Sequence, residues 1–205
     1  MVQATEAMKI DWQDLQGSVE PYYNPFEALS DEQLYYLSIY AQVTEIEADY
    51  PEQVTDAMKE EATAAKAALV ADNIDIAYLL AQRLLLIEKR QKAAKTINPL
   101  LADKKIEMSG FMLALTFDNG LVSEFLLVPV MGACSHKPVP AANQIVYVTT
   151  QKAVKTGSPY MPVTVTGMLR ITPQEKDLYL VDGQKVIEMA YSLEDTLVEP
   201  HIATH

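Results

Sequence analysis

Residues 105–130 read KIEMSGFMLALTFDNGLVSEFLLVPV, and this stretch decides the fold class. From Leu101 onward the spacing of apolar residues becomes two, which is the period of a β-strand. Asn119 and Gly120, in the middle of the stretch, tolerate the positive φ angles that a tight hairpin turn requires. The stretch therefore predicts two long antiparallel strands joined by a turn at Asp118–Gly120.

Four further segments downstream have the same strand-like period. They are QIVYVTT (144–150), PVTVTGMLRI (162–171), DLYLVDG (177–183) and VIEMAYSL (186–193). Gly110 and Gly167 lie inside predicted strands, where glycine often marks a bulge or a sharp bend. Short antiparallel strands that bend at glycines predict a small closed β-barrel. The OB-fold is the preferred interpretation, and a two-sheet sandwich is the alternative.

Residues 30–98 precede the strands and have helical periodicity instead. Ser30 followed by Gln33 is the pattern of a capping box, which begins the first helix. A second helix follows Pro51, and a third spans about residues 74–95. We expect the second and third helices to pack as an antiparallel hairpin with close, alanine-rich contacts.

The predicted fold class is therefore α+β, with three successive parts. An N-terminal extended segment covers residues 1–29, a helical region covers 30–98, and an antiparallel β domain covers 102–200. Trp12 is expected to anchor the N-terminal segment onto the β domain.

Composition narrows the functional classes. The 205 residues carry a net charge of −12, which opposes binding to nucleic acid because that partner needs a basic protein surface. Apolar residues make up 49% of the chain, yet no run of about 18 of them predicts a membrane span. The single cysteine excludes an internal disulfide. No phosphate-binding loop, dinucleotide-binding glycine pattern or G-x-S-x-G motif occurs, and we expect no organic cofactor.

The only cysteine, Cys134, stands two residues from one of the three histidines, His136. In an extended segment these two residues share one face, so a thiolate and an imidazole there can bind one metal ion. Zinc or copper(I) suits this pair of sulfur and nitrogen ligands. Two ligands do not complete a site, so others must come from elsewhere in the chain. The candidates are Glu107, Asp118, Glu124, His201 and His205.

Two other interpretations of the pair stay open. In one, Cys134 is a nucleophile, His136 is its base and Asn143 orients the base, which describes a thiol hydrolase. In the other, Cys134 is a buried apolar filler and the loop belongs to a protein-interaction module. Residues that restrict the loop conformation favour a functional loop on the barrel. These loop-shaping residues are Gly132, Pro138, Pro140, Asn143 and Gln144.

Residues 110–148, GFMLALTFDNGLVSEFLLVPVMGACSHKPVPAANQIVYV, resemble an uncharacterised (DUF-class) family of bacterial exported proteins. The pattern of that family includes Gly-Ala-Cys-x-His, a proline-rich stretch and then Asn-Gln. PVTVTGMLRI at 162–171 and IDWQDL at 10–15 also resemble the family. The likeness is strong over residues 106–171, where Val139 departs from the denser proline run of the family.

The resemblance implies that the chain is exported to the periplasm or lipid-anchored, with its signal peptide removed. It also implies a gene beside ABC transporter genes of the lipoprotein-release or macrolide-export type, some of which are zinc-regulated. We therefore expect a non-enzymatic periplasmic accessory protein of an ABC-type transport system. Its expected partners are a transporter or envelope protein and a transition metal, zinc first, bound by Cys134 and His136.

Overall fold

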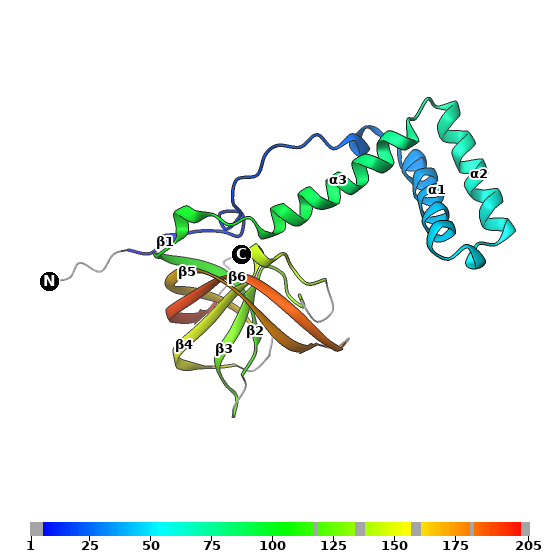
Figure 1. Ribbon diagram of the computed structural model, residues 1–205. Helices are drawn as coiled ribbons and strands as arrows, with labels where there is room; N and C mark the ends of the chain where they lie inside the picture. Colours follow the sequence, from blue (N-terminus) through cyan, green and yellow to red (C-terminus); the bar gives the residue numbers. More distant parts are fainter. Residues whose placement is uncertain (1–5, 117–118, 134–137, 157–160, 181–182, 202–205) are drawn as a thin grey trace. The chain divides into compact units, whose positions relative to one another are not determined.

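The computed structural model describes residues 6–116, 119–133, 138–156, 161–180 and 183–201 (Figure 1). The described α-helices are α1 (Asp31–Asp49), α2 (Asp56–Ala71) and α3 (Ile76–Lys95). The described strands are β1 (Met8–Lys9), β2 (Lys104–Ala114), β3 (Leu121–Val128), β4 (Val146–Lys155), β5 (Pro162–Leu180) and β6 (Gly183–Pro200). Short 3-10 helices occur at Pro25–Ala28, Pro51–Gln53, Pro99–Leu101 and Ala142–Gln144.

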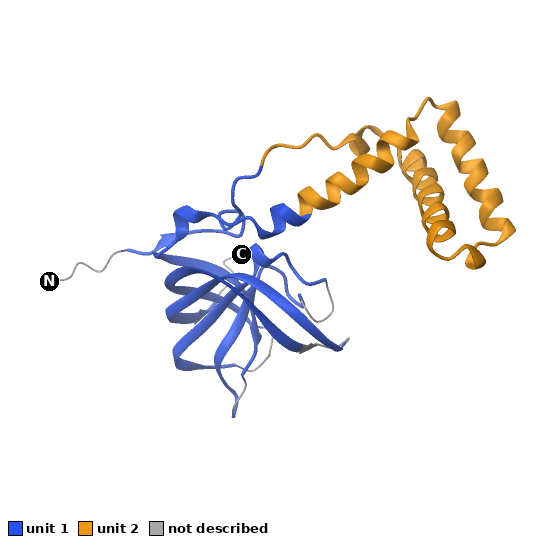
Figure 2. Cartoon of the chain, in the orientation of Figure 1, with its two compact units in different colours: residues 1–19, 91–205 blue, residues 20–90 orange. Residues whose placement is uncertain are grey.

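Contacts divide the chain into two compact units (Figure 2). Residues 20–90 form the first, which we call the helical unit. Residues 1–19 and 91–205 form the second, which contains all the described strands and which we call the β unit. Each unit is described below by itself.

The strands of the β unit form one sheet that partly closes into a ring (Figure 1). β2 pairs antiparallel with β3, β3 pairs antiparallel with β4, and β4 runs parallel to β6. β6 pairs antiparallel with β5, and β5 returns to pair antiparallel with β2. β1 adds a short parallel pairing to β2. Three helices and a six-stranded sheet in the described residues confirm the α+β class.

β3 is buried on both of its faces. Phe125 and Leu127 belong to the main core inside the ring. Leu126 and Val128 belong instead to a second apolar cluster, which Ile187 of β6 also joins. Because successive side chains of a strand point to opposite faces, burial on both faces explains the continuous apolar run in this strand.

β5 and β6 are longer than the sequence pattern predicted. They pair with each other along nearly their whole length, and two bulges shift their register. Residues 177–180 end β5, so the separate strand expected there was wrong, whereas the strand expected at 186–193 is part of the longer β6. A bulge adds one residue and bends a strand without ending it. The extra residue interrupts the alternation of apolar and polar residues, so the sequence pattern predicts two strands where there is one.

Both glycines inside strands allow a close approach. Gly167 lies opposite the bulge at the register shift between β5 and β6, where an added Cβ would meet the Glu194 carbonyl oxygen at 2.7 Å. Gly110 lies where the backbone and a ring approach closely, because an added Cβ would meet Trp12 at 2.7 Å and the Val128 carbonyl oxygen at 2.9 Å. Trp12 also donates its indole N–H to the Ser109 carbonyl at 2.9 Å, which anchors the N-terminal segment as expected.

In the helical unit, α1 begins with the predicted capping box. The Ser30 hydroxyl accepts from the Gln33 backbone N–H at 3.2 Å, and the Gln33 side chain accepts from the Ser30 N–H at 3.0 Å. These bonds satisfy backbone donors that the first turn of a helix leaves unpaired. Among the described helices, none is both long enough and apolar enough to cross a membrane.

The helix pairing differs from the one predicted. α1 and α2 pack along each other, with Leu37 and Leu69 in one buried cluster and the Lys66 ammonium 5.5 Å from the Tyr40 ring centroid. The expected hairpin of the second and third helices is therefore wrong. The alanine stripe of α2 packs against α1 instead, and Leu79 is the one fully buried side chain among those described in α3.

Candidate functional site

Cys134 and His136 lie outside the described residues, as do Asp118 and His205. The segments on either side of the Cys-x-His pair are described, and both are attached to the rest of the β unit. Their contacts define where the loop begins and ends.

The upstream segment leaves β3 and turns before the pair. The Ala133 N–H donates to the Val130 carbonyl at 3.1 Å, which closes the turn. Gly132 has a φ of +77°, in the left-handed region that glycine adopts without strain. Ala133 is buried in the second apolar cluster together with Ile145, so the chain enters the loop from a fixed point.

The downstream segment is attached through the side chain of Asn143. This residue is 2% exposed, and its amide donates to the Ala93 carbonyl at 2.8 Å and to the Thr96 carbonyl at 2.7 Å. The last carbonyls of a helix have no partner within the helix. Asn143 therefore caps the C-terminal end of α3 from another part of the chain, and both of its amide hydrogens are used in doing so.

Gln144 makes a second attachment beside it. Its side-chain amide donates to the Trp12 carbonyl at 2.9 Å and to the Asn143 carbonyl at 3.0 Å. The loop is thus bonded on its downstream side to the N-terminal segment as well as to α3. The bond from Gln144 to Trp12 could not be predicted from the sequence, because these two residues are 132 positions apart.

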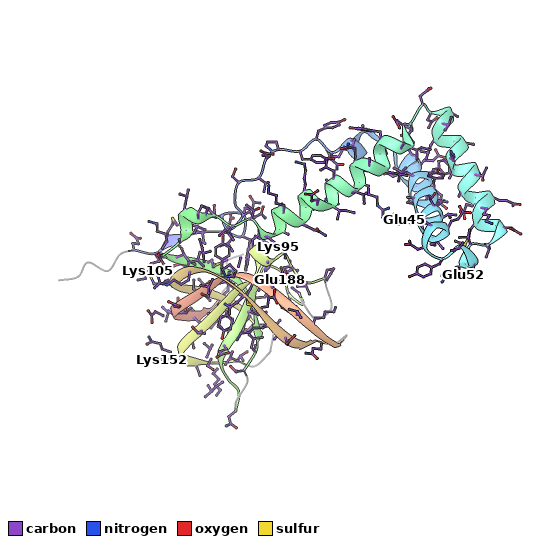
Figure 3. The ribbon with its side chains drawn as sticks, in the orientation of Figure 1. Glu45, Glu52, Lys95, Lys105, Lys152 and Glu188 are labelled. Carbon is purple, nitrogen blue, oxygen red and sulfur yellow. The ribbon has the colours of Figure 1, made fainter. Side chains whose placement is uncertain are left out.

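A surface groove borders this downstream segment, and we call it the junction groove. It lies on both sides of an ion pair in which the Lys95 ammonium is 2.6 Å from the Glu188 carboxylate (labelled in Figure 3). One side, about 540 Å³, is lined by Val139 and Pro140 among others. The other side, about 590 Å³, extends to Pro173 and continues along β6.

The ion pair at the groove remains open to water. The Lys95 and Glu188 side chains are 64% and 44% exposed, so their attraction adds little to stability. Their charges remain accessible to a ligand in the groove. Neither residue was singled out from the sequence, because a lysine at a helix end and a glutamate in a strand are common surface residues.

The other proposed ligands have their own partners. Glu107 is 3.3 Å from the Lys9 ammonium, and Glu124 is 3.6 Å from that of Lys176. His201 has its Nδ1 atom 3.0 Å from the Thr164 hydroxyl. In the described part of the chain, no three His, Cys, Asp or Glu side chains gather closely enough to hold a metal ion.

Tyr191 is a buried polar residue that no sequence pattern indicated. Its hydroxyl donates to the Leu15 carbonyl at 2.7 Å and accepts from the Asn98 N–H at 2.7 Å. Burial raises the pKa of the Tyr191 phenol, and the bond from Asn98 opposes that effect. The residue joins the N-terminal segment, the segment after α3 and strand β6 at one point.

Comparison with curated proteins finds no match. Among solved structures, the chain is similar to the crystal structure of a DUF3299 family protein from Pseudomonas aeruginosa PAO1, with a TM-score of 0.53. The two sequences are 20% identical, and the alignment covers 98% of this chain and 99% of that one. The likeness shows a shared fold. A family described as "Protein of unknown function (DUF3299)" matches residues 12–200, and the chain belongs to this family.

Proposed function

We propose that this protein is an exported accessory protein of an ABC-type transport system that binds a transition metal, zinc first, through Cys134 and His136. The observation that supports the metal site is the attachment of both neighbouring segments, by the turn at Ala133 and by the Asn143 amide. A loop with fixed ends loses less conformational entropy when its ligands close on a metal ion. Export and the transporter context rest on the sequence resemblance.

The proposed site needs ligands beyond these two, since zinc sites in proteins use three or four. Glu188 is one candidate, because its carboxylate lies in the junction groove with Val139 and Pro140, close in sequence to His136. Metal binding there would replace the ammonium of Lys95 as the partner of Glu188. Carboxylate oxygen is an accepted zinc ligand beside sulfur and nitrogen.

Calorimetric titration of the reduced protein with Zn(II) tests the site. We expect sub-micromolar binding that is lost in both Cys134→Ser and His136→Ala and weakened in Glu188→Gln. His201→Ala is the matched control, because this imidazole is bonded to Thr164. Absence of binding, or binding that both loop variants retain, contradicts the metal site.

Localisation is tested separately by fractionating cells that express the natural gene. We expect the protein in the periplasmic or membrane-anchored fraction. Recovery in the cytosol with an unprocessed N-terminus contradicts export, whatever the metal titration gives.

The second candidate function is a protein-interaction module of the envelope in which Cys134 is structural. Three apolar residues beside the loop support it: Val130 is 42% exposed, Met131 52% and Val139 37%. Exposed apolar residues on both sides of a loop are typical of a docking surface. A thiol hydrolase is the remote third candidate; in it the Asn143 Oδ1 atom would orient His136 while the amide nitrogen holds the two backbone carbonyls.

We also infer that the ring of β2, β3, β4, β6 and β5 is a small barrel of the OB type. Its support is the return pairing of β5 to β2 and the single parallel pair, β4 with β6, within that ring. A five-stranded, partly open Greek-key barrel has this kind of closure. An experimental structure of the chain in which β2 and β5 are unpaired contradicts it.

A further inference from the structure

The helical unit contains a groove of about 560 Å³ that the proposed metal site does not use. It lies between α1, α3 and the segment at Asn24–Phe26, and its lining residues all belong to the helical unit, which is orange in Figure 2. Its apolar walls are Phe26, Leu34, Leu37, Ala41, Leu80 and Leu86. We call it the helical groove. Its volume falls in the range of small-molecule sites, which is about 300–1,000 Å³.

Two arginines and one glutamate also line the helical groove, and their partners differ. Arg83 forms an ion pair with Glu45 of α1, so these two charges compensate each other. Arg90 has no hydrogen bond or ion pair with any described residue. The groove therefore combines an apolar wall with one uncompensated cation. A ligand complementary to it has an apolar body and a single anionic end.

The wall formed by α3 sets the dimensions of that ligand. Leu80, Arg83, Leu86 and Arg90 of α3 all line the groove. From Leu80 to Arg90 the rise is about 15 Å, roughly the extended length of a twelve-carbon chain. An alkyl chain of that length matches the apolar wall, and a single anionic head group matches the one uncompensated cation at its end.

We propose that the helical groove binds a single-chain alkyl carboxylate. Its carboxylate would bond to the guanidinium of Arg90, and its chain would lie against Leu86, Leu80 and Phe26. A guanidinium binds a carboxylate through charge-assisted hydrogen bonds, and the chain gains affinity from each methylene it buries.

The overall charge of the helical unit opposes this ligand. Residues 20–90 contain fourteen Asp and Glu but five Lys and Arg. The negative electrostatic field of these residues favours binding of a cationic amphiphile. The contact with Arg90 favours an anionic one, since nearby charges act more strongly than distant, screened ones. The sign of the preferred head group therefore tests the proposal directly.

The experiment is a calorimetric titration of the full chain with laurate and with dodecyltrimethylammonium, each below its micelle concentration. We expect one laurate per chain and at least tenfold weaker binding of the cation. Across octanoate, decanoate and laurate, each added methylene should raise the affinity by roughly fourfold while it remains buried. Equal or tighter binding of the cation, or no saturable laurate binding, overturns the proposal.

Two matched pairs of variants locate the site. Arg90→Gln should weaken laurate binding roughly five- to tenfold, whereas Lys89→Gln, whose ammonium lies over the Tyr22 ring, should change it less than about twofold. Leu86→Asp should abolish binding, whereas Leu84→Asp should preserve it because Leu84 is 69% exposed and does not line the groove. Circular dichroism checks that all four variants keep their helices. Loss in both variants of a pair, or in neither, overturns the assignment.

Discussion

Asn143 joins two parts of the β unit that are distant in sequence. Its two amide hydrogens reach carbonyls at the end of α3, 50 and 47 residues earlier in the chain. The Ala93 carbonyl also accepts from the Thr96 N–H at 3.2 Å, and the Thr96 carbonyl accepts from the Gly17 N–H at 3.1 Å, so Asn143 supplies a second donor to each. Asn143 therefore stabilises the helix end and positions the loop that follows Cys134 and His136.

Replacement of Asn143 tests that dual role. Asn143→Ala should lower the free energy of unfolding by about 2 kcal/mol, because two partly buried hydrogen bonds, each worth about 1 kcal/mol, are lost. Urea denaturation measures the change. Gln151→Ala is the control, since its amide bonds an exposed Asp195. A loss no larger than that of the control contradicts the capping role.

The buried phenol of Tyr191 makes stability depend on alkaline pH. Its pKa is raised by burial, so the folded protein holds this proton more tightly than the unfolded chain does. The contribution is fully present below the unfolded pKa of about 10 and is lost as the pH rises through the higher folded value. Wild-type stability should therefore fall above about pH 10 more steeply than that of Tyr191→Phe. Denaturation across pH 8–11 measures both, and parallel curves contradict the prediction.

The outer half of the β5–β6 hairpin covers the ring from outside. Ile187 and Met189 of β6 are fully buried against Leu126 and Val128 of β3. The neighbouring Val186 points the other way and is 59% exposed. This second cluster gives the sheet two apolar layers in place of one.

Substitutions in this part of β6 measure how much the second apolar cluster contributes to the free energy of unfolding. Ile187→Ala should lower the free energy of unfolding by about 2–4 kcal/mol, because it removes buried methyl groups and leaves a cavity. Val186→Ala, one position away on the exposed side, should change it by less than about 0.5 kcal/mol. Similar effects at the two positions would mean that the hairpin does not pack on the ring.

Elements encoded by neighbouring residues were predictable, and their long-range partners were not. The capping box of Ser30 and the hairpin at Asn119–Gly120 depend on residues a few positions apart, so their patterns are visible in the sequence. The helix pairing was missed because alanine stripes permit close packing without specifying the neighbour. The return of β5 to β2 depends on residues about 60 positions apart, as in Lys104 with Leu169, and leaves no local pattern.

In the candidate site, too, features that depend on neighbouring residues were predictable and long-range contacts were not. Residue types in the Cys-x-His segment indicated a loop with metal-binding chemistry, and the prolines indicated a restricted conformation. Nothing in the sequence indicated that Asn143 reaches α3 or that Lys95 meets Glu188, since each contact joins segments that come together only when the ring forms.

Negative charge is concentrated in the helical unit. Residues 20–90 contain fourteen acidic and five basic residues, whereas the remainder contains fourteen acidic and eleven basic residues. Like charges in a compact unit repel one another and lower its stability. The helical unit should therefore respond to salt more strongly than the β unit.

Hydrogen exchange resolved by segment measures this difference. Raising NaCl from about 0.01 M to about 1 M shortens the Debye length from about 30 Å to about 3 Å. Amide exchange in α1 and α2 should slow markedly more than exchange in β3 and β4. Salt effects that act on every protein surface change both units, so the β unit is the internal control. Equal slowing in the two units contradicts the prediction.

The interleaved order of the two units has a consequence for synthesis on the ribosome. Residues 20–90 emerge as one continuous stretch, so the helical unit can complete its contacts early. The β unit needs residues at both ends of the chain, since β1 pairs with β2 and β6 closes the ring against β4 and β5. Because chains grow at about 5–20 residues per second, the N-terminal segment waits roughly ten seconds or more for its partners. Nascent chains of this protein should therefore depend on chaperones late in translation, when β2 to β5 are made but the ring is still open.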